Sequence, residues 1–234
     1  MVPGRSKKVF KTWLEGQTAQ SRDGVEVVAM DGFSGFKTAT AEVLPEATAV
    51  MDPFHVVALA SAKIDQCRQR VQQATLGHRG RSGDPLYGVQ RVLHTGANQL
   101  TDKQITRLKA VFASDEHVEV EATWGIYQRI VAAYRHPDRA TGKKALQAVI
   151  DDLTQGVPTQ LTELITLGRT LKRPALDVLD YFDHPGTSNG PTEAINGRLE
   201  HLRRTALGFR NLARYVIRAL LDTRGFRTEL HRHL

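Results

Sequence analysis

The 234-residue chain contains little sulfur and few aromatic side chains. A single cysteine, Cys67, excludes an intramolecular disulfide and a metal site built from Cys-x-x-Cys pairs. Aromatic residues make up 6% of the chain, so a stacking platform for single-stranded nucleic acid is not indicated. No apolar run approaches the roughly 18 residues of a membrane-spanning helix, and residues 1–10 lack the apolar segment of a signal peptide. We therefore expect a cytoplasmic protein with no membrane partner.

The composition is that of a folded globular chain with an excess of positive charge. Hydrophobic residues make up 41% and charged residues 24% of the chain, which excludes a disordered tail. The formal net charge is +7, and nine arginines against three acids leave +6 within residues 198–234 alone. Such a block favours a polyanionic partner, above all nucleic acid, because guanidinium groups suit phosphates. The alternative is a solvated helical face whose arginines lie over apolar surface.

The first quarter of the chain has the pattern of a small α/β unit. Two short apolar runs, at residues 25–30 and 47–51, are typical of strands in a parallel sheet that is buried on both faces. Residues 36–44 between them indicate a helix that ends before Pro45. Together these segments predict a right-handed strand–helix–strand unit, and a short helix over residues 7–14 precedes it.

The rest of the chain reads as helical. Helices are predicted at residues 56–70, after the capping box that Thr101 begins, and at 118–134, 140–153, 159–171, 191–204 and 211–222. Residues 77–85 form a basic loop with glycine near each end, which we expect only a ligand to order. The fold class predicted is α/β with predominantly helical content, divided into residues 1–55, 56–186 and 187–234.

Two aspartates follow the two predicted strands. Asp31 comes directly after the first strand and Asp52 directly after the second. Ligands and catalytic groups collect at the carboxyl ends of strands in open α/β sheets. Asp52 precedes Pro53 and has an alternative role as the cap of the following helix. No turn requires a carboxylate at Asp31, so it is the stronger candidate for chemistry.

A third carboxylate lies in the segment TSNGPTEAINGRLE at residues 187–200. Pro191 suits the first helical position, which places Glu193 in a first turn where the helix dipole stabilises a carboxylate. At about 100° per residue, one face is polar and carries Glu193, Asn196, Gly197, Glu200 and Arg204. The opposite face is apolar and carries Ile195, Leu199, Leu202 and Ala206. We expect the apolar face to pack the helix, while the polar face points at a metal or substrate, or only at water.

Several segments of the chain resemble one protein family. They are VVAMDGFSGF, VMDPFHVV, TLGRTLKR, YFDHPGTSNGPTEAINGRLEHLRR and ALGFRNLARYVIRALLDTRGFR. Together they are similar to the C-terminal part of a bacterial insertion-sequence transposase of the ISL family, in the DDE group. The resemblance covers residues 4–234. It implies a partial ribonuclease-H-like catalytic core interrupted by a large helical insertion.

The resemblance also implies catalytic residues and a cofactor. Asp31 matches the second catalytic aspartate of the family and Glu193 its glutamate, so both are expected to be catalytic and to bind Mg²⁺ or Mn²⁺. Hard divalent ions prefer oxygen ligands, and a metal pair promotes in-line attack on phosphate. Asp52 and His55 match a supporting element on the next strand, although His55 has the alternative of orienting a carboxylate or capping the helix. Asn196 is a further supporting candidate.

The implied activity is DNA cleavage and strand transfer on double-stranded DNA, at transposon ends and target. The arginines expected to contact DNA are Arg198, Arg203, Arg204, Arg210 and Arg214. We also expect the protein to form a homo-oligomer. In the family, three strands and the first catalytic aspartate precede the helix that residues 7–14 resemble. We therefore expect a truncated, catalytically incomplete copy. The alternatives are a non-catalytic DNA-binding module, which would also use the basic loop at 78–81, and a non-functional remnant with an exposed sheet edge.

Overall fold

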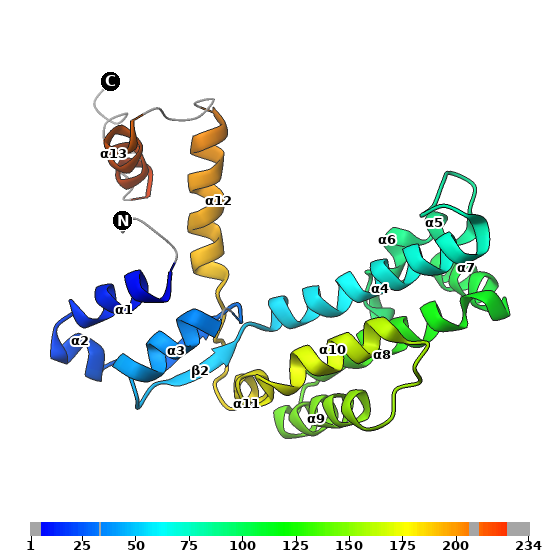
Figure 1. The fold of residues 1–234 in the computed structure, drawn as a ribbon, viewed down its shortest axis with the longest axis horizontal. Helices are drawn as coiled ribbons and strands as arrows, with labels where there is room; N and C mark the ends of the chain where they lie inside the picture. Colours follow the sequence, from blue (N-terminus) through cyan, green and yellow to red (C-terminus); the bar gives the residue numbers. More distant parts are fainter. Residues whose placement is uncertain (1–5, 33, 206–210, 224–234) are drawn as a thin grey trace.

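The computed structural model describes residues 6–32, 34–205 and 211–223 (Figure 1). The elements, in chain order, are α1 (Lys7–Glu15), α2 (Ala19–Asp23), β1 (Val27–Met30), α3 (Ser34–Val43), β2 (Thr48–Met51), α4 (Pro53–Leu76), α5 (Pro85–Gly88), α6 (Gln90–Leu93), η1 (Ala97–Gln99), α7 (Asp102–Phe112), η2 (Asp115–His117), α8 (Val118–Tyr134), α9 (Arg139–Gln155), α10 (Thr162–Lys172), α11 (Ala175–Leu179), η3 (Asp180–Phe182), α12 (Gly190–Thr205) and α13 (Leu212–Thr223). The prediction of an α/β chain with mostly helical content is confirmed.

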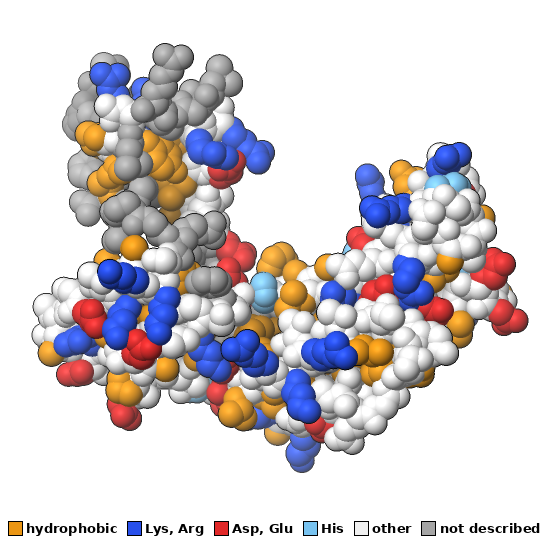
Figure 2. Space-filling view, viewed as in Figure 1, with side chains coloured by type: hydrophobic (Ala, Val, Ile, Leu, Met, Phe, Trp, Pro, Cys, Tyr) orange, Lys and Arg blue, Asp and Glu red, His pale blue; other side chains and the backbone are white. Residues whose placement is uncertain are grey.

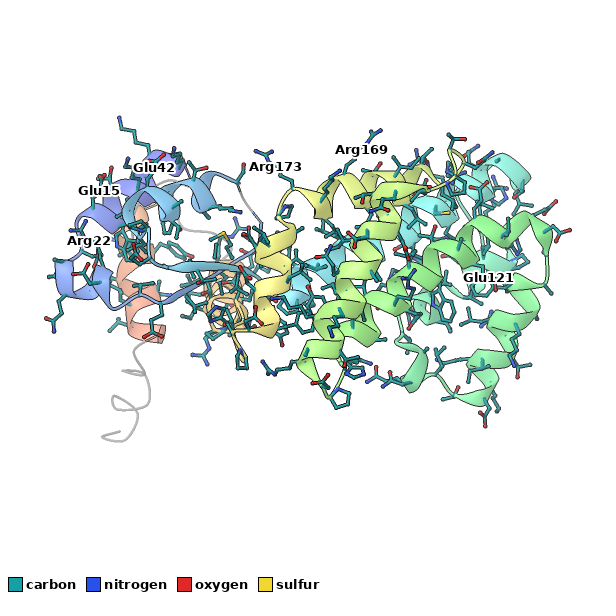
Figure 3. All side chains as sticks on the ribbon, turned by 90° about the horizontal axis from the view of Figure 1, so that it is seen from below. Glu15, Arg22, Glu42, Glu121, Arg169 and Arg173 are labelled. Atoms are coloured by element: carbon teal, nitrogen blue, oxygen red, sulfur yellow. The ribbon has the colours of Figure 1, made fainter. Side chains whose placement is uncertain are left out.

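The two strands form the α/β unit with α1 and α3. Strands β1 and β2 are parallel, with Val27 opposite Thr48, and they are the sheet's only members within the described ranges. Helix α1 packs on α3, where the rings of Phe10 and Phe36 lie 4.9 Å apart. Glu42 of α3, labelled in Figure 3, accepts hydrogen bonds from two lysines of α1 at 2.6 and 2.7 Å. These contacts hold α1 over the sheet's connecting helix.

Helix α4 joins this unit to a block of helices (Figure 1). It begins after the Asp52 cap with Pro53 in its first turn, and it ends at Gly77, whose φ of +73° suits a residue without a side chain. Helix α4 packs on α8, α8 on α9, α9 on α10, and α10 returns to α4. One continuous hydrophobic core fills this block and includes Ile64, Ile130 and Leu146. The block therefore has a core of its own that depends on helix packing.

Two features of the α/β unit and the loops differ from the predictions. Only Met30 of β1 is buried, so the predicted burial on both faces is wrong, because a sheet of two described strands has too few neighbours to cover it. The basic loop at residues 77–85 is held by hydrogen bonds from the chain itself. The backbone N–H of Arg81 donates to Asp84 at 2.6 Å, and the Gln72 amide donates to the same carboxylate at 3.4 Å.

Helix α12 stands away from the α/β unit and from the helical block, and α13 lies beside it (Figure 1). No residue of α12 is buried, and Ile195 is 47% exposed. The predicted packing of its apolar face is therefore only partial, because Leu199 and Leu202 are half-buried while Ile195 is exposed, and Ala206 lies outside the described residues. None of the helices in the described ranges combines the length and apolarity that crossing a bilayer requires.

Candidate functional site

Asp52 connects three parts of the structure through one buried carboxylate. One oxygen, Oδ1, accepts a hydrogen bond from the backbone N–H of Phe54 at 2.8 Å and so caps α4. The other, Oδ2, accepts from the backbone N–H of Asn189 at 2.5 Å and from the Ser188 hydroxyl at 3.4 Å. The backbone N–H of Asp52 donates to the carbonyl of Met30 at 3.0 Å. Asp52 therefore fixes the start of α12 at the carboxyl ends of both strands.

Asp31 lies at the end of β1, exposed, on a cavity of about 700 Å³. We call this space the Asp31 cavity. Its walls come from α1, β1 and α3 on one side and from α12 and α13 on the other. Thr192, Asn196 and Glu200 of α12 contribute polar groups to it, and Thr40 of α3 contributes a buried hydroxyl. The structure thus brings Asp31 and Asn196, both predicted site residues, to one space.

Glu193, the other predicted catalytic residue, is not among the residues that line the Asp31 cavity. It is exposed in the first turn of α12, four residues after the Asn189 backbone that Asp52 holds. At about 100° per residue, its direction around the helix axis differs by about 20° from that of Glu200, which lines the cavity. Glu200, and not Glu193, therefore shares the Asp31 cavity with Asp31.

The donors around this cavity fit a hard divalent ion in kind but not in number. Asp31 offers a carboxylate oxygen and Asn196 an amide oxygen, which are ligands that Mg²⁺ accepts. In the part of the chain that the structure describes, no group of three or more His, Cys, Asp or Glu side chains is placed to hold a metal ion.

Sequence reasoning left Glu200 without a role, although this carboxylate also lines the Asp31 cavity. It pairs with Arg203 at 2.9 Å and with Arg204 at 3.0 Å. Hydrogen bonds from these two guanidinium groups lower the pKa of the Glu200 carboxyl to about 2. The signal in the sequence was its spacing, since arginines three and four residues later share its side of the helix.

His55 lies away from the Asp31 cavity. Its ring faces Gly32, where a Cβ atom would come 3.5 Å from His55 Nε2 and 3.0 Å from Met51 Cε. His55 lines a second cavity, beside Met51 and between α3, α4 and α10. The structure therefore places the two residues of the predicted supporting element in different surroundings, since Asp52 holds α12 and His55 packs under Gly32.

The predicted DNA-contacting arginines lie on α12 and α13. Arg198, Arg203, Arg204 and Arg214 are all exposed, while Arg210 lies outside the described residues. Figure 2 shows blue side chains with a red neighbour along α12, in agreement with the ion pairs of Glu200. Of the three arginines on α12, Arg203 and Arg204 are therefore partly neutralised by Glu200.

Comparison with known proteins gives a family match over most of the chain. The family model DDE_Tnp_ISL3, described as "Transposase", matches residues 1–219. Two proteins named "Transposase for insertion sequence element IS1557", from Mycobacterium tuberculosis strains CDC 1551 / Oshkosh and ATCC 25618 / H37Rv, are each 24% identical over 261 residues. These alignments cover 99% of this chain but 56% of each relative, so the chain spans about half the length of the curated relatives it matches. No solved structure matches the chain.

Proposed function

The chain belongs to this transposase family, and we propose that it carries part of a DDE active site that cleaves DNA and transfers strands of an insertion sequence. One observation supports the proposal above others. The buried Asp52 carboxylate holds the backbone of Asn189 at 2.5 Å, at the strand end that Asp31 follows. This contact supports the proposal because it holds the end of α12 that carries Glu193 near the carboxyl ends of both strands.

The residues proposed to hold Mg²⁺ or Mn²⁺ are Asp31 and Glu193, with Asn196 in support. When bound, such an ion activates the attacking hydroxyl or water and stabilises the leaving oxygen of the phosphate. Asp52 acts by positioning, since its two oxygens are already engaged by backbone and hydroxyl donors.

We propose that a further strand, in a longer form of this chain, completes the site with a third carboxylate. Within the described residues, β1 pairs only with β2 and leaves its other edge unpaired. The buried Thr40 hydroxyl on the Asp31 cavity also has no hydrogen-bond partner among the described residues. A strand added along β1 would end beside Asp31, where parallel strands place their carboxyl ends.

Metal titration tests the carboxylate assignment directly. We expect weak Mn²⁺ binding by the chain, followed by electron paramagnetic resonance, and loss of that binding in Asp31→Asn and in Glu193→Gln. Glu26→Gln is the matched control, because Glu26 is an exposed carboxylate at the opposite end of β1. Equal binding by all four proteins would show that Asp31 and Glu193 do not form the site.

A second candidate function is a DNA-binding module without catalysis. It is favoured by the lack of a three-ligand metal cluster among the described residues and by the exposed arginines of α12. Both candidates involve duplex DNA, whereas only the first predicts metal-dependent strand transfer by the longer form. A homo-oligomeric assembly stays a prediction under either.

A further inference from the structure

A second cavity, of about 760 Å³, lies between α3, α4 and α10. We call it the α10 cavity. It shares only Met30 with the residues that line the Asp31 cavity. Apolar side chains such as Met51 and Leu59 form part of its lining, while Lys37, Arg169 and Arg173 bring positive charge. A cavity of this composition suits an anion held by cations over an apolar base.

The charge in the α10 cavity is not balanced by the acid that lines it. Arg169 and Arg173 lie four residues apart, so they share one face of the helix and differ by about 6 Å along its axis. Figure 3 shows both side chains projecting outward on the same side of α10. Asp177 already pairs with Lys37 at 2.7 Å, and the ion pairs of the described residues include neither arginine. Two exposed arginines therefore line this space without an ion-pair partner among the described residues.

The remaining polar groups favour a ligand that accepts hydrogen bonds. The hydroxyls of Thr166 and Thr170, on the same face of α10, each donate to a carbonyl one turn earlier at 2.8 Å. Their protons are thus engaged, and donation to a ligand comes from the arginines. Ser34 adds the start of α3, where the first backbone N–H groups of a helix have no intrahelical partner. A phosphate group has the charge and the acceptor oxygens that this set requires.

Gly32 connects the α10 cavity to the proposed active site. It follows Asp31 directly, has a φ of +78°, and itself lines the α10 cavity. A side chain at this position would press on Met51, whose Cε lies 3.0 Å from the Cβ position. The α10 cavity therefore reaches the residue that follows Asp31 in the chain.

We propose that Arg169 and Arg173 bind the phosphodiester backbone of duplex DNA at the α10 cavity. This contact is separate from the arginines of α12 and α13. It rests on the proposed function only for the identity of the polyanion, because the charge and the hydrogen-bond donors belong to the cavity itself. The contact positions DNA beside Asp31 and reads no base sequence.

Salt-dependent DNA binding by the full chain tests the proposal. Fluorescence anisotropy with a short labelled duplex is measured over a series of salt concentrations for wild type, Arg169→Gln and Arg173→Gln. Each arginine that contacts a phosphate should contribute about 0.9 to the slope of log affinity against log salt, so each variant should lose about that much. Lys172→Gln is the matched control. This substitution also removes one positive charge from α10, but Lys172 does not line the cavity. Thermal melting of each variant checks that it folds.

A slope loss in both arginine variants but not in Lys172→Gln supports the proposal. If the slopes of both arginine variants equal the slope of Lys172→Gln, the proposal is overturned, whether or not DNA binds elsewhere on the chain. If wild type binds no DNA at low salt, the proposed function fails, and the cavity is then tested with inorganic phosphate by amide NMR. We then expect phosphate to shift the amide signals of Ser34 and His55. If these shifts vanish in the Arg169→Gln, Arg173→Gln double variant, they support a phosphate site at the α10 cavity. The absence of such shifts overturns it.

Discussion

Replacing Asp52 separates its two structural roles, because its two oxygens bind different partners. Asp52→Asn keeps an acceptor for the Phe54 backbone N–H, and asparagine caps helices about as well as aspartate. The amide must then present its NH₂ group to the backbone N–H of Asn189, where two donors meet. Asp52→Ala removes both contacts. The asparagine variant therefore isolates the contact that holds the start of α12.

The expected size of each effect follows from burial. A hydrogen bond to a charged acceptor contributes roughly 1.5–3 kcal/mol, so losing it should speed hydrogen exchange at Asn189 by roughly 10- to 150-fold. Global stability should change little in Asp52→Asn, because no residue of α12 is buried and its release exposes no core. Asp52→Ala also loses the cap of α4, which should lower the free energy of unfolding by a further ~1 kcal/mol.

Two measurements decide between these roles. Hydrogen exchange resolved by NMR reports opening at Asn189, and chemical denaturation reports the free energy of unfolding of the chain. Unchanged exchange at Asn189 in Asp52→Asn would refute the claim that this carboxylate holds α12. Equal unfolding free energies for the asparagine and alanine variants would refute its capping role.

Four further predictions follow from other sites. Hydrogen bonds from two lysines hold the pKa of Glu42 at about 2, below its unfolded value. Thermal melting should therefore show the largest destabilisation by Glu42→Gln at neutral pH, and this difference from wild type should vanish as the pH falls toward 2. Gly32→Ala should lower the free energy of unfolding by ~1–3 kcal/mol in chemical denaturation, since its φ is +78° and Met51 lies 3.0 Å from the added carbon. Burial raises the pKa of the Cys67 thiol to about 11, so a disulfide reagent at pH 8 should modify it only after unfolding. Strand transfer should be absent from this chain and present in the longer form, and Glu193→Gln should abolish it there while changing folding stability by only ~0.3–1 kcal/mol.

The hydrophobic pattern determined most of the secondary structure. The predicted helix at 118–134 coincides with α8, and the predicted strands at 25–30 and 47–51 contain β1 and β2. Helix α4 extends beyond its prediction at both ends, from Pro53 to Leu76. The periodicity of apolar residues is a local property, and the sequence contains it in full. Element ends depend on caps such as Asp52, whose helix-capping alternative the structure shows.

The candidate site could be predicted only as residue types at strand and helix ends. The sequence placed Asp31, Asp52 and Glu193 at such ends, and the family match supports a transposase. It left Asp52 open between chemistry and capping, because a helical wheel or a strand end does not show what a side chain contacts. Only the tertiary structure showed that Asp52 binds the backbone of Asn189, 137 residues away in the chain.

The surroundings of α12 and the α10 cavity also needed tertiary structure. An amphipathic pattern predicts a buried face, yet Ile195 is exposed, because burial depends on which neighbours reach that face. Arg169 and Arg173 line the same cavity as His55 only because α10 packs back on α4. Local periodicity is determined by adjacent residues, whereas a cavity is made by segments far apart in the chain, and their approach is decided by packing of the whole core.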